Sequence, residues 1–198
     1  MSANLDDEEL PAYEGITLAD VRLVKSGADA AEALAALSGA DVIGFDTESK
    51  PTFAKGEDST GPHLVQLATD DTAWLFQIGA APPAAAVDVL RAVLEAPGIL
   101  KVGFGLGDDL RRLRSKLGIE TNNVLDLSTA LRRGERNALG AKTAVARFFG
   151  QRLQKSKRIT TTNWAQPRLS EKQILYAADD AHVALRIYRH WRETTPAK

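Results

Sequence analysis

The stretch DVIGFDTES, residues 41–49, predicts a buried strand that ends in two acids. Successive side chains of a strand point to opposite faces, so Asp46 and Glu48 share one face. That face also carries Val42 and Gly44, and the opposite face carries Ile43, Phe45 and Thr47. Both faces begin with apolar residues, which indicates a central strand. Sites in open α/β folds are built at strand ends, although two acids there are, by themselves, more often ordinary polar residues.

The rest of the sequence predicts strands and helices around this strand. We expect strands at residues 21–26, 64–69, 72–78, 99–105 and 123–127, and helices at residues 29–38, 83–96, 109–118 and 170–191. An Asp-Asp turn joins the second and third of these strands as a hairpin. The remainder is expected to be helical apart from the basic, Thr-rich residues 151–169. This order indicates an α/β domain whose mixed sheet starts antiparallel, continues with parallel strands and is flanked by helices.

The composition is that of one ordinary globular domain. The 198 residues are 44% hydrophobic and 26% charged, which is typical of soluble proteins. The absence of cysteine excludes disulfides, thiolate catalysis and thiolate zinc sites, and suits a reducing compartment. The start MSANLDDEEL lacks the pattern of a signal peptide, and no run approaches the ~20 apolar residues of a membrane span. We therefore expect a cytoplasmic protein with no membrane partner.

The charge is unevenly distributed although its formal total is −1. Residues 1–15 contain acids and no basic side chain, so we predict a flexible acidic tail there and a single domain over residues 16–198. Residues 132–168 contain ten basic side chains and one acid, a local charge of +9. A local positive potential attracts a phosphate backbone. Judged by charge alone, a solvated basic face with no partner is an equally good interpretation.

The last predicted helix, SEKQILYAADDAHVALRIYRHW, carries an acid on its apolar side. Its start is marked by Ser170 and Gln173, which fit a capping box. Tyr176 and Asp180 share a stripe with apolar side chains further along the helix. An acid in such a stripe is costly to bury unless a cation or hydrogen bonds compensate it, whereas Asp179, about 60° away, is expected to be solvated. Taken alone, Tyr176 also fits an ordinary half-buried aromatic residue, and Asp180 a surface ion pair.

The segment KVGFGLGDDLRRL, residues 101–113, poses a choice between phosphate and metal binding. A dinucleotide-binding loop would have the pattern G-x-G-x-x-G. Here the third glycine is displaced, and two acids open the helix where they would repel a phosphate, so we expect no dinucleotide cofactor. The glycines more simply let the chain pass close to a bulky neighbour while the helix start presents an acid. Asp108 fits the N-cap position, which leaves Asp109 free for another role.

Four acids therefore stand at element ends or on a helix stripe, namely Asp46, Glu48, Asp109 and Asp180. Carboxylates that gather in one place raise one another's pKa unless cations neutralise them. Oxygen ligands without cysteine select hard ions, here Mg²⁺ or Mn²⁺. Two such ions about 3.5–4 Å apart serve in-line phosphoryl displacement, which is the chemistry of a nuclease.

The same segments resemble the motifs of the DEDD exonucleases, in the tyrosine-bearing (DEDDy) branch that includes RNase D and the Werner-type exonuclease domain. FDTES resembles the first motif, D-x-E, and VGFGLGDDL resembles the second in its Werner-type form. LYAADDAHVALRIY resembles the third motif, Y-x-x-x-D. The histidine-bearing branch would have His where this chain has Leu175. LVQLAT and NWAQPRLS also resemble family segments, so the resemblance extends over about residues 40–191.

The resemblance implies a ribonuclease-H-like fold and a metal-dependent 3′–5′ exonuclease that releases nucleotides from nucleic-acid 3′ ends, in DNA or RNA. It implies that the four acids ligate two metal ions and that Tyr176 orients the attacking water. The backbone around Thr47 would lie near the terminal nucleotide. Loss of any one acid is expected to abolish most activity, because phosphoryl transfer depends on positioning and electrostatics.

Other residues receive supporting roles. Lys155, Lys157 and Arg158 precede the third motif and are candidates for sequence-independent contacts with phosphates. Trp164 could stack on a base, although packing is the more common role of a lone tryptophan. Asp126 stands at a predicted strand end, and we expect it to cap local structure.

Four matters stay open on the sequence alone. Because the second and third motifs have doubled acids, Asp108 or Asp179 could take the place of its neighbour. The same fold could serve as a catalytically silent nucleic-acid-binding module, although such domains commonly lose an acid and here every acid is present. The sequence decides neither DNA against RNA nor the oligomeric state.

Overall fold

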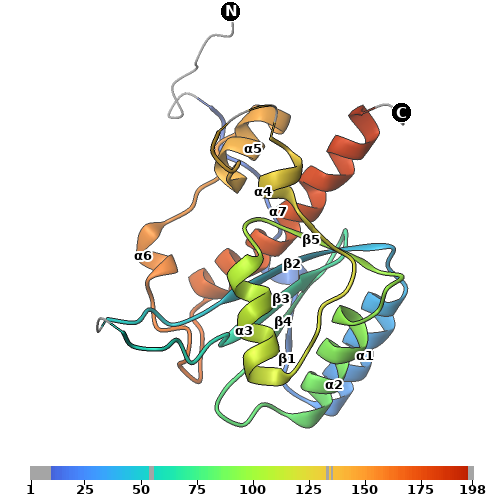
Figure 1. Ribbon diagram of the computed structural model, residues 1–198, viewed down its shortest axis with the longest axis vertical. Coiled ribbons are helices and arrows are strands. Elements are labelled where there is room, and N and C mark those ends of the chain that lie inside the picture. The colour runs from blue at the N-terminus through green and yellow to red at the C-terminus, as the bar shows by residue number, and fades with distance from the viewer. Residues whose placement is uncertain (1–9, 54–55, 133, 135, 196–198) are drawn as a thin grey trace, which may run out of the picture.

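The computed structural model describes residues 10–53, 56–132, 134 and 136–195, and its centre is a mixed sheet (Figure 1). In the described part of the chain the sheet has six strands in the order β1-β4-β3-β2-β5-β6. The strands are β1 (Val21–Val24), β2 (Val42–Glu48), β3 (Leu64–Ala68), β4 (Ala73–Gln77), β5 (Leu100–Gly103) and β6 (Val124–Asp126). β2, β3 and β4 are antiparallel neighbours, whereas β5 and β6 continue parallel to β2, and β1 runs parallel to β4. The predicted mixed sheet is confirmed.

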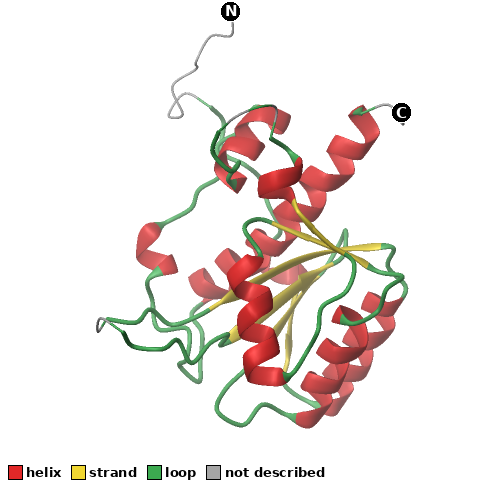
Figure 2. Ribbon diagram, in the orientation of Figure 1, coloured by secondary structure: helices red, strands yellow, loops and turns green. Residues whose placement is uncertain are grey.

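Helices cover both faces of this sheet (Figure 2). They are α1 (Gly27–Ser38), α2 (Ala84–Leu94), α3 (Gly107–Leu117), α4 (Leu127–Ala130), α5 (Ala141–Phe149), α6 (Lys157–Thr160) and α7 (Glu171–Thr194), with a short 3-10 helix η1 (Leu18–Asp20). The single turn of α6 corrects our expectation of no helix in residues 151–169; the carbonyl of Ser156 accepts the N–H groups that close it. Among the described helices, none is both long and apolar enough to cross a membrane.

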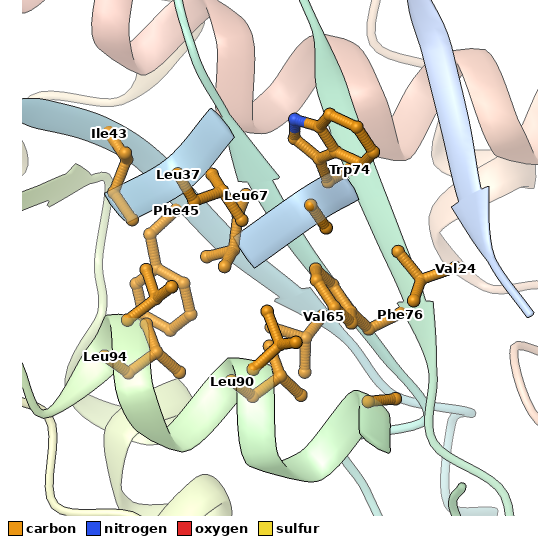
Figure 3. Packing of buried hydrophobic residues seen from close by; sticks show 14 of the residues in the cluster. Val24, Leu37, Ile43, Phe45, Val65, Leu67, Trp74, Phe76, Leu90 and Leu94 are labelled. Atoms are coloured by element: carbon orange, nitrogen blue, oxygen red, sulfur yellow. The ribbon is translucent and has the colours of Figure 1, made fainter. Parts of the chain in front are cut away.

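One face of the sheet is covered by α1 and α2 (Figure 3). Ile43 and Phe45 of β2 are fully buried there against Leu37 of α1 and against Leu90 and Leu94 of α2. This is the face that strand alternation assigned to Ile43 and Phe45. Burial of such side chains contributes about 1.5–3 kcal/mol each, so this layer fixes the position of the central strand.

The other face of the sheet is crossed by α7, which runs behind the strands in Figure 1. Ser170 and Gln173 form the predicted capping box at its start. The backbone of α7 lies directly on β2 at Gly44, where a Cβ atom would overlap the carbonyl oxygen of Ala181. A side chain larger than that of glycine would push the helix away. The close approach places the acidic end of β2 beside Asp180, the neighbour of Ala181.

Residues 11–16, which we call the N-terminal segment, pack against α7. Arg186 of α7 donates hydrogen bonds to the Tyr13 hydroxyl (3.2 Å) and to the backbone carbonyl of the residue that follows Tyr13 (3.0 Å). Tyr13 and Ile16 are buried among apolar side chains of α7 and its neighbours. The flexible tail predicted over residues 1–15 is therefore too long, because these two side chains offset the acidic composition by burial. The first nine residues lie outside the described part of the chain.

Candidate active site

Three acids meet where β2 ends against α7. Asp46 and Glu48 come from β2 and Asp180 from α7, and one oxygen of each carboxylate lies within 4.8 Å of the others. Glu48 and Asp180 are buried, and Asp46 is half-buried. We call these residues the three-acid cluster. The alternation of the strand and the stripe of the helix, both visible in the sequence, bring them together.

The carboxylates of the three-acid cluster lack sufficient compensating charge. Burial raises the pKa of Asp46 well above its ordinary value, and the negative charges of Asp180 and Asp109 raise it further. Burial and the charge of Asp46 raise the pKa of Glu48 to about 9. Burial also raises the pKa of Asp180. Since these groups offer only oxygen ligands, a hard divalent cation held among them could supply the missing charge.

One ammonium group contacts the three-acid cluster. Lys155 Nζ lies 2.8 Å from Asp180 Oδ1 and 5.7 Å from the centre of the Tyr176 ring. Burial by itself would lower the pKa of Lys155, but the attraction of Asp180 and Asp46 outweighs burial and the pKa is raised. Lys155 therefore stays charged, and it supplies one positive charge to three carboxylates. We predicted that Lys155 contacts a phosphate, and in the structure it forms an ion pair with Asp180.

The fourth predicted acid, Asp109, reaches the site from the start of α3. Its Oδ1 accepts a hydrogen bond from the hydroxyl of Thr47, which lies between the two acids of β2. Burial raises the pKa of Asp109, and the hydrogen bond from Thr47 offsets part of that rise. Asp109 is not one of the acids whose oxygens all lie within 4.8 Å, but its charge acts on Asp46. All four predicted acids thus gather at one end of β2.

The loop before α3 holds Asp109 in position. Gly105 has a φ of +69°, a left-handed backbone that favours glycine. Asp126 accepts hydrogen bonds from the N–H groups of Gly105 and the next residue (2.9 and 3.0 Å). It also caps α4 through the N–H of Ser128 (2.9 Å). Asp126 has the structural role that we predicted. A Cβ atom on Gly103 would overlap a carbonyl of β2, so here the glycine does make room for a neighbour.

The doubled acids of the second and third motifs have different surroundings. Asp108 is exposed and pairs with Arg111 at 2.8 Å; it is not the N-cap that we predicted, because α3 already begins at Gly107. Asp179 is half-buried and accepts the N–H of Ile16 (3.3 Å), and burial raises its pKa to about 6. Our expectation that Asp179 is solvated was wrong, because the N-terminal segment covers it. Neither acid belongs to the three-acid cluster.

Tyr176 lies one turn before Asp180 on α7, beside the three-acid cluster. Its hydroxyl is 2.9 Å from the hydroxyl of Thr160. Burial and the nearby charge of Asp180 raise the pKa of Tyr176 to about 12. Tyr176 therefore keeps its proton at neutral pH, and its hydroxyl can donate one hydrogen bond and accept others.

The remaining predicted contacts lie in and around α6. Arg158 is exposed on this short helix. The side chain of Lys157 lies outside the described part of the structure. Trp164 is buried, and its indole Nε1 donates to the carbonyl of Thr160 (3.2 Å). This confirms packing as the role of Trp164.

Three contacts of the site were missed by the sequence analysis. They are the ion pair of Lys155 with Asp180, the hydrogen bond of Thr160 with Tyr176 and the hydrogen bond of Thr47 with Asp109. Both Lys155 and Thr160 belong to the basic, Thr-rich stretch, whose sequence has no periodicity that would fix the direction of a side chain. Its position just before the third motif indicated proximity to the site but not the partners.

Comparisons with known proteins agree with this geometry. The profile of a family described as 3′-5′ exonuclease matches residues 21–195. The mouse protein "Bifunctional 3'-5' exonuclease/ATP-dependent helicase WRN" is 30% identical over 157 residues, which are 77% of this chain and 11% of that protein. This chain therefore spans a small part of that relative.

Solved structures share the fold. The Aedes aegypti Nibbler EXO domain has a TM-score of 0.76 and 25% identity, and the match covers 91% of this chain and 92% of that one. RNase D of Trypanosoma brucei in complex with RNA U12 also has a TM-score of 0.76, at 23% identity, over 86% of this chain and 61% of that one. These neighbours confirm the predicted ribonuclease-H-like fold.

Proposed function

This chain belongs to the 3′–5′ exonuclease family, and from that premise we propose that it hydrolyses the terminal phosphodiester bond at a nucleic-acid 3′ end with the help of two divalent cations. One observation carries the proposal. Oxygens of Asp46, Glu48 and Asp180 lie within 4.8 Å of one another. Acids so close and so buried are costly in the charged state unless cations lie between them.

The residues present fit divalent metal ions. The three-acid cluster offers carboxylate oxygens, and Asp109 adds another carboxylate at the same end of β2. Such ligands select Mg²⁺ or Mn²⁺, and four carboxylates can hold two ions. When bound, the ions would supply a water of lowered pKa and a counter-charge for the leaving oxygen.

The residues of the chain would orient the reactants around that site. Tyr176, which keeps its proton because its pKa is raised, would hold the attacking water through its hydroxyl. Thr160 restrains that hydroxyl from one side. The backbone around Thr47 would lie beside the terminal nucleotide. Phosphoryl transfer depends mainly on positioned groups, and these contacts would provide them.

Nucleic acid, either DNA or RNA, is the proposed partner. The Trypanosoma brucei RNase D that shares the fold was solved with RNA U12, which supports RNA as one candidate. Lys155, Lys157 and Arg158 are our candidates for phosphate contacts, because such contacts require charge rather than sequence. We also propose a cytoplasmic location, which the absence of cysteine supports.

Digestion of 5′-labelled oligonucleotides tests the proposed function. The panel consists of DNA and RNA, each single-stranded and as a duplex with a recessed 3′ end. With Mg²⁺ or Mn²⁺ we expect products that shorten stepwise from the 3′ end, and with EDTA we expect intact substrate. Asp180→Asn should lose most cleavage. Asp88→Asn, which changes an exposed acid of α2 on the opposite face of the sheet, is the matched control and should cleave as the parent does.

Three outcomes would count against the proposal. Intact substrate with every metal, from a protein shown to be folded, would contradict it. Binding of these oligonucleotides without any cleavage would identify the chain as a silent nucleic-acid-binding module instead. Equal cleavage by the parent and by Asp180→Asn would move the chemistry away from the three-acid cluster.

A further inference from the structure

The ammonium group of Lys155 already contacts one acid of the three-acid cluster. Its Nζ is 2.8 Å from Asp180 Oδ1, and about a third of the Lys155 side chain is exposed (30%) against 6% of the Asp180 side chain. The Tyr176 ring lies beside the same ammonium, with its centre 5.7 Å away. Within the described part of the chain, Lys155 with Asp180 is the ion pair that an acid of the three-acid cluster makes. A positive charge therefore sits on one of the carboxylates that fit a metal ion.

A divalent cation and this ammonium would compete for Asp180. A hard ion binds carboxylate oxygens at about 2.0–2.6 Å, which is closer than an ammonium group approaches. Two cations on one buried carboxylate repel each other strongly, because the interior screens charge poorly. Binding of metal by Asp46, Glu48 and Asp180 together therefore requires the Lys155 ammonium to leave Asp180.

The segment that carries Lys155 has room to move. On one side, Gln154 and Ile159 line a cavity of about 320 Å³ that extends to Tyr176. On another side, Ser156 and Ile159 line an open cavity of about 700 Å³. The backbone N–H of Lys155 bonds only to the nearby Leu153 carbonyl among the bonds described for it (3.1 Å). Displacement of Lys155 therefore does not require a packed core to open.

We propose that Lys155 is a built-in counter-ion of the three-acid cluster, one that occupies Asp180 before metal binds and is displaced when metal enters. The inference rests on the proposed function in one respect, that the cluster takes divalent cations. Before metal arrives, the ion pair compensates part of the charge of the buried acids and holds the segment before α6 against α7. Release from Asp180 frees the ammonium for the phosphate contact proposed above.

Direct measurement of Mn²⁺ binding tests the proposal without any cleavage assay. Isothermal titration calorimetry would compare the metal-free parent with Lys155→Met, which keeps the length of the side chain and removes its charge. We expect Lys155→Met to bind Mn²⁺ about tenfold or more tightly than the parent, because no ion pair has to be broken first. Lys172→Met is the matched control. It removes an exposed lysine early in α7, and its Mn²⁺ affinity should stay within about twofold of the parent because solvent and salt screen that charge.

Equal or weaker Mn²⁺ binding by Lys155→Met would overturn the proposal. If that variant does not fold without metal, the parent itself provides the second measurement. In protein labelled with ¹⁵N-lysine, the side-chain ammonium signal of Lys155, assigned by its absence from Lys155→Arg, should shift in step with Mg²⁺ saturation. A signal that stays unchanged while Mg²⁺ saturates the site would equally overturn the proposal.

The two proposals fail in different ways. If the parent binds neither ion and cuts no nucleic acid, the proposed function falls, and the counter-ion role falls with it. If the parent cuts nucleic acid with Mn²⁺ while Lys155→Met and the parent bind Mn²⁺ equally, the counter-ion role alone falls.

Discussion

The hydroxyl of Thr47 donates a hydrogen bond to the carboxylate of Asp109. Thr47 alternates with Asp46 and Glu48 along β2, so it points to the opposite face of the strand. One strand end thus meets an acid of α7 on one face and an acid of α3 on the other. The fold places four carboxylates around three consecutive residues, although the acids come from three separate parts of the sequence.

Asp109 and its neighbour Asp108 should respond differently to the same substitution. We expect Asp109→Asn to lower kcat by about 10²-fold or more, because a positioned charge at the reacting phosphate is lost. Asp108→Asn should stay close to the parent, since Asp108 is exposed and pairs only with Arg111 among its described contacts. Single-turnover digestion of a labelled oligonucleotide measures both. A severe loss in Asp108→Asn would mean that the register of the second motif is shifted.

Removal of the Tyr176 hydroxyl should slow chemistry without weakening metal binding. In Tyr176→Phe the ring still packs against Trp164, but the group that would orient water is gone. We expect kcat to fall by about tenfold to a hundredfold, with Mn²⁺ affinity from calorimetry unchanged. Thr160→Val, which removes the partner of that hydroxyl, should cause a smaller loss of the same kind. An unchanged kcat in Tyr176→Phe would remove the residue from the mechanism.

Gly44 should be intolerant of the smallest side chain. In Gly44→Ala the new Cβ atom would overlap the carbonyl oxygen of Ala181, so α7 must shift away from β2. We expect a loss of about 1–3 kcal/mol or more in the free energy of unfolding, together with weaker metal binding. Gly79→Ala is the control, because a Cβ atom on Gly79 would point into open space, with no neighbour within 4 Å. Urea unfolding measures both variants, and equal midpoints would contradict the prediction.

The metal-free protein should lose stability as pH rises from 7 to 8. Burial raises the pKa of Glu48 from 4.5 to about 9, so in this window the folded chain holds a proton that the unfolded chain has released. The free energy of unfolding then falls by about 1.4 kcal/mol per pH unit for each such group. Groups whose pKa is lowered by burial have the opposite effect on stability, and of the two with a large shift His63 acts mainly below this window and Lys101 mainly above it. The pKa of His63 is lowered to about 4 and that of Lys101 to about 8, mainly by burial in both cases.

Urea unfolding in EDTA at the two pH values measures this slope. Saturating Mn²⁺ should abolish or reverse it, because metal favours the ionised carboxylates. Glu48→Gln should reduce it in the absence of metal. Stability that rises from pH 7 to pH 8 in EDTA would show that the acids are ionised without metal.

The elements and the acids could be predicted because they depend on local patterns. The alternation of side chains along a strand placed Asp46 and Glu48 on one face. The apolar stripe of the last helix placed Asp180 on the buried side of that helix. The ends of elements were less exact. The strand predicted at residues 99–105 stops at Gly103, because Gly105 turns the chain with a positive φ.

Contacts between distant segments could not be predicted from such patterns. Asp179 is covered by Ile16, which is 163 positions away, and no local signal reports such a partner. Lys101 is a lysine in a strand, yet it is completely buried, with its ammonium on the carbonyls of Ala96 (2.6 Å) and Asn122 (3.0 Å). In each case the decisive partner is a backbone group whose position exists only after folding.

The folded domain begins earlier in the chain than the similarity to the family does, because the N-terminal segment is part of the fold. Similarity to the family begins at residue 21, but the carbonyl of Pro11 already accepts the N–H of Arg152 (2.8 Å). A shortened version that starts at Val21 would lack Ile16, whose N–H bonds to Asp179. Asp179 and the side of α7 next to Tyr176 would then be exposed to solvent. Any transplant or fusion of this exonuclease-family domain should therefore keep the ten residues upstream of the recognisable homology.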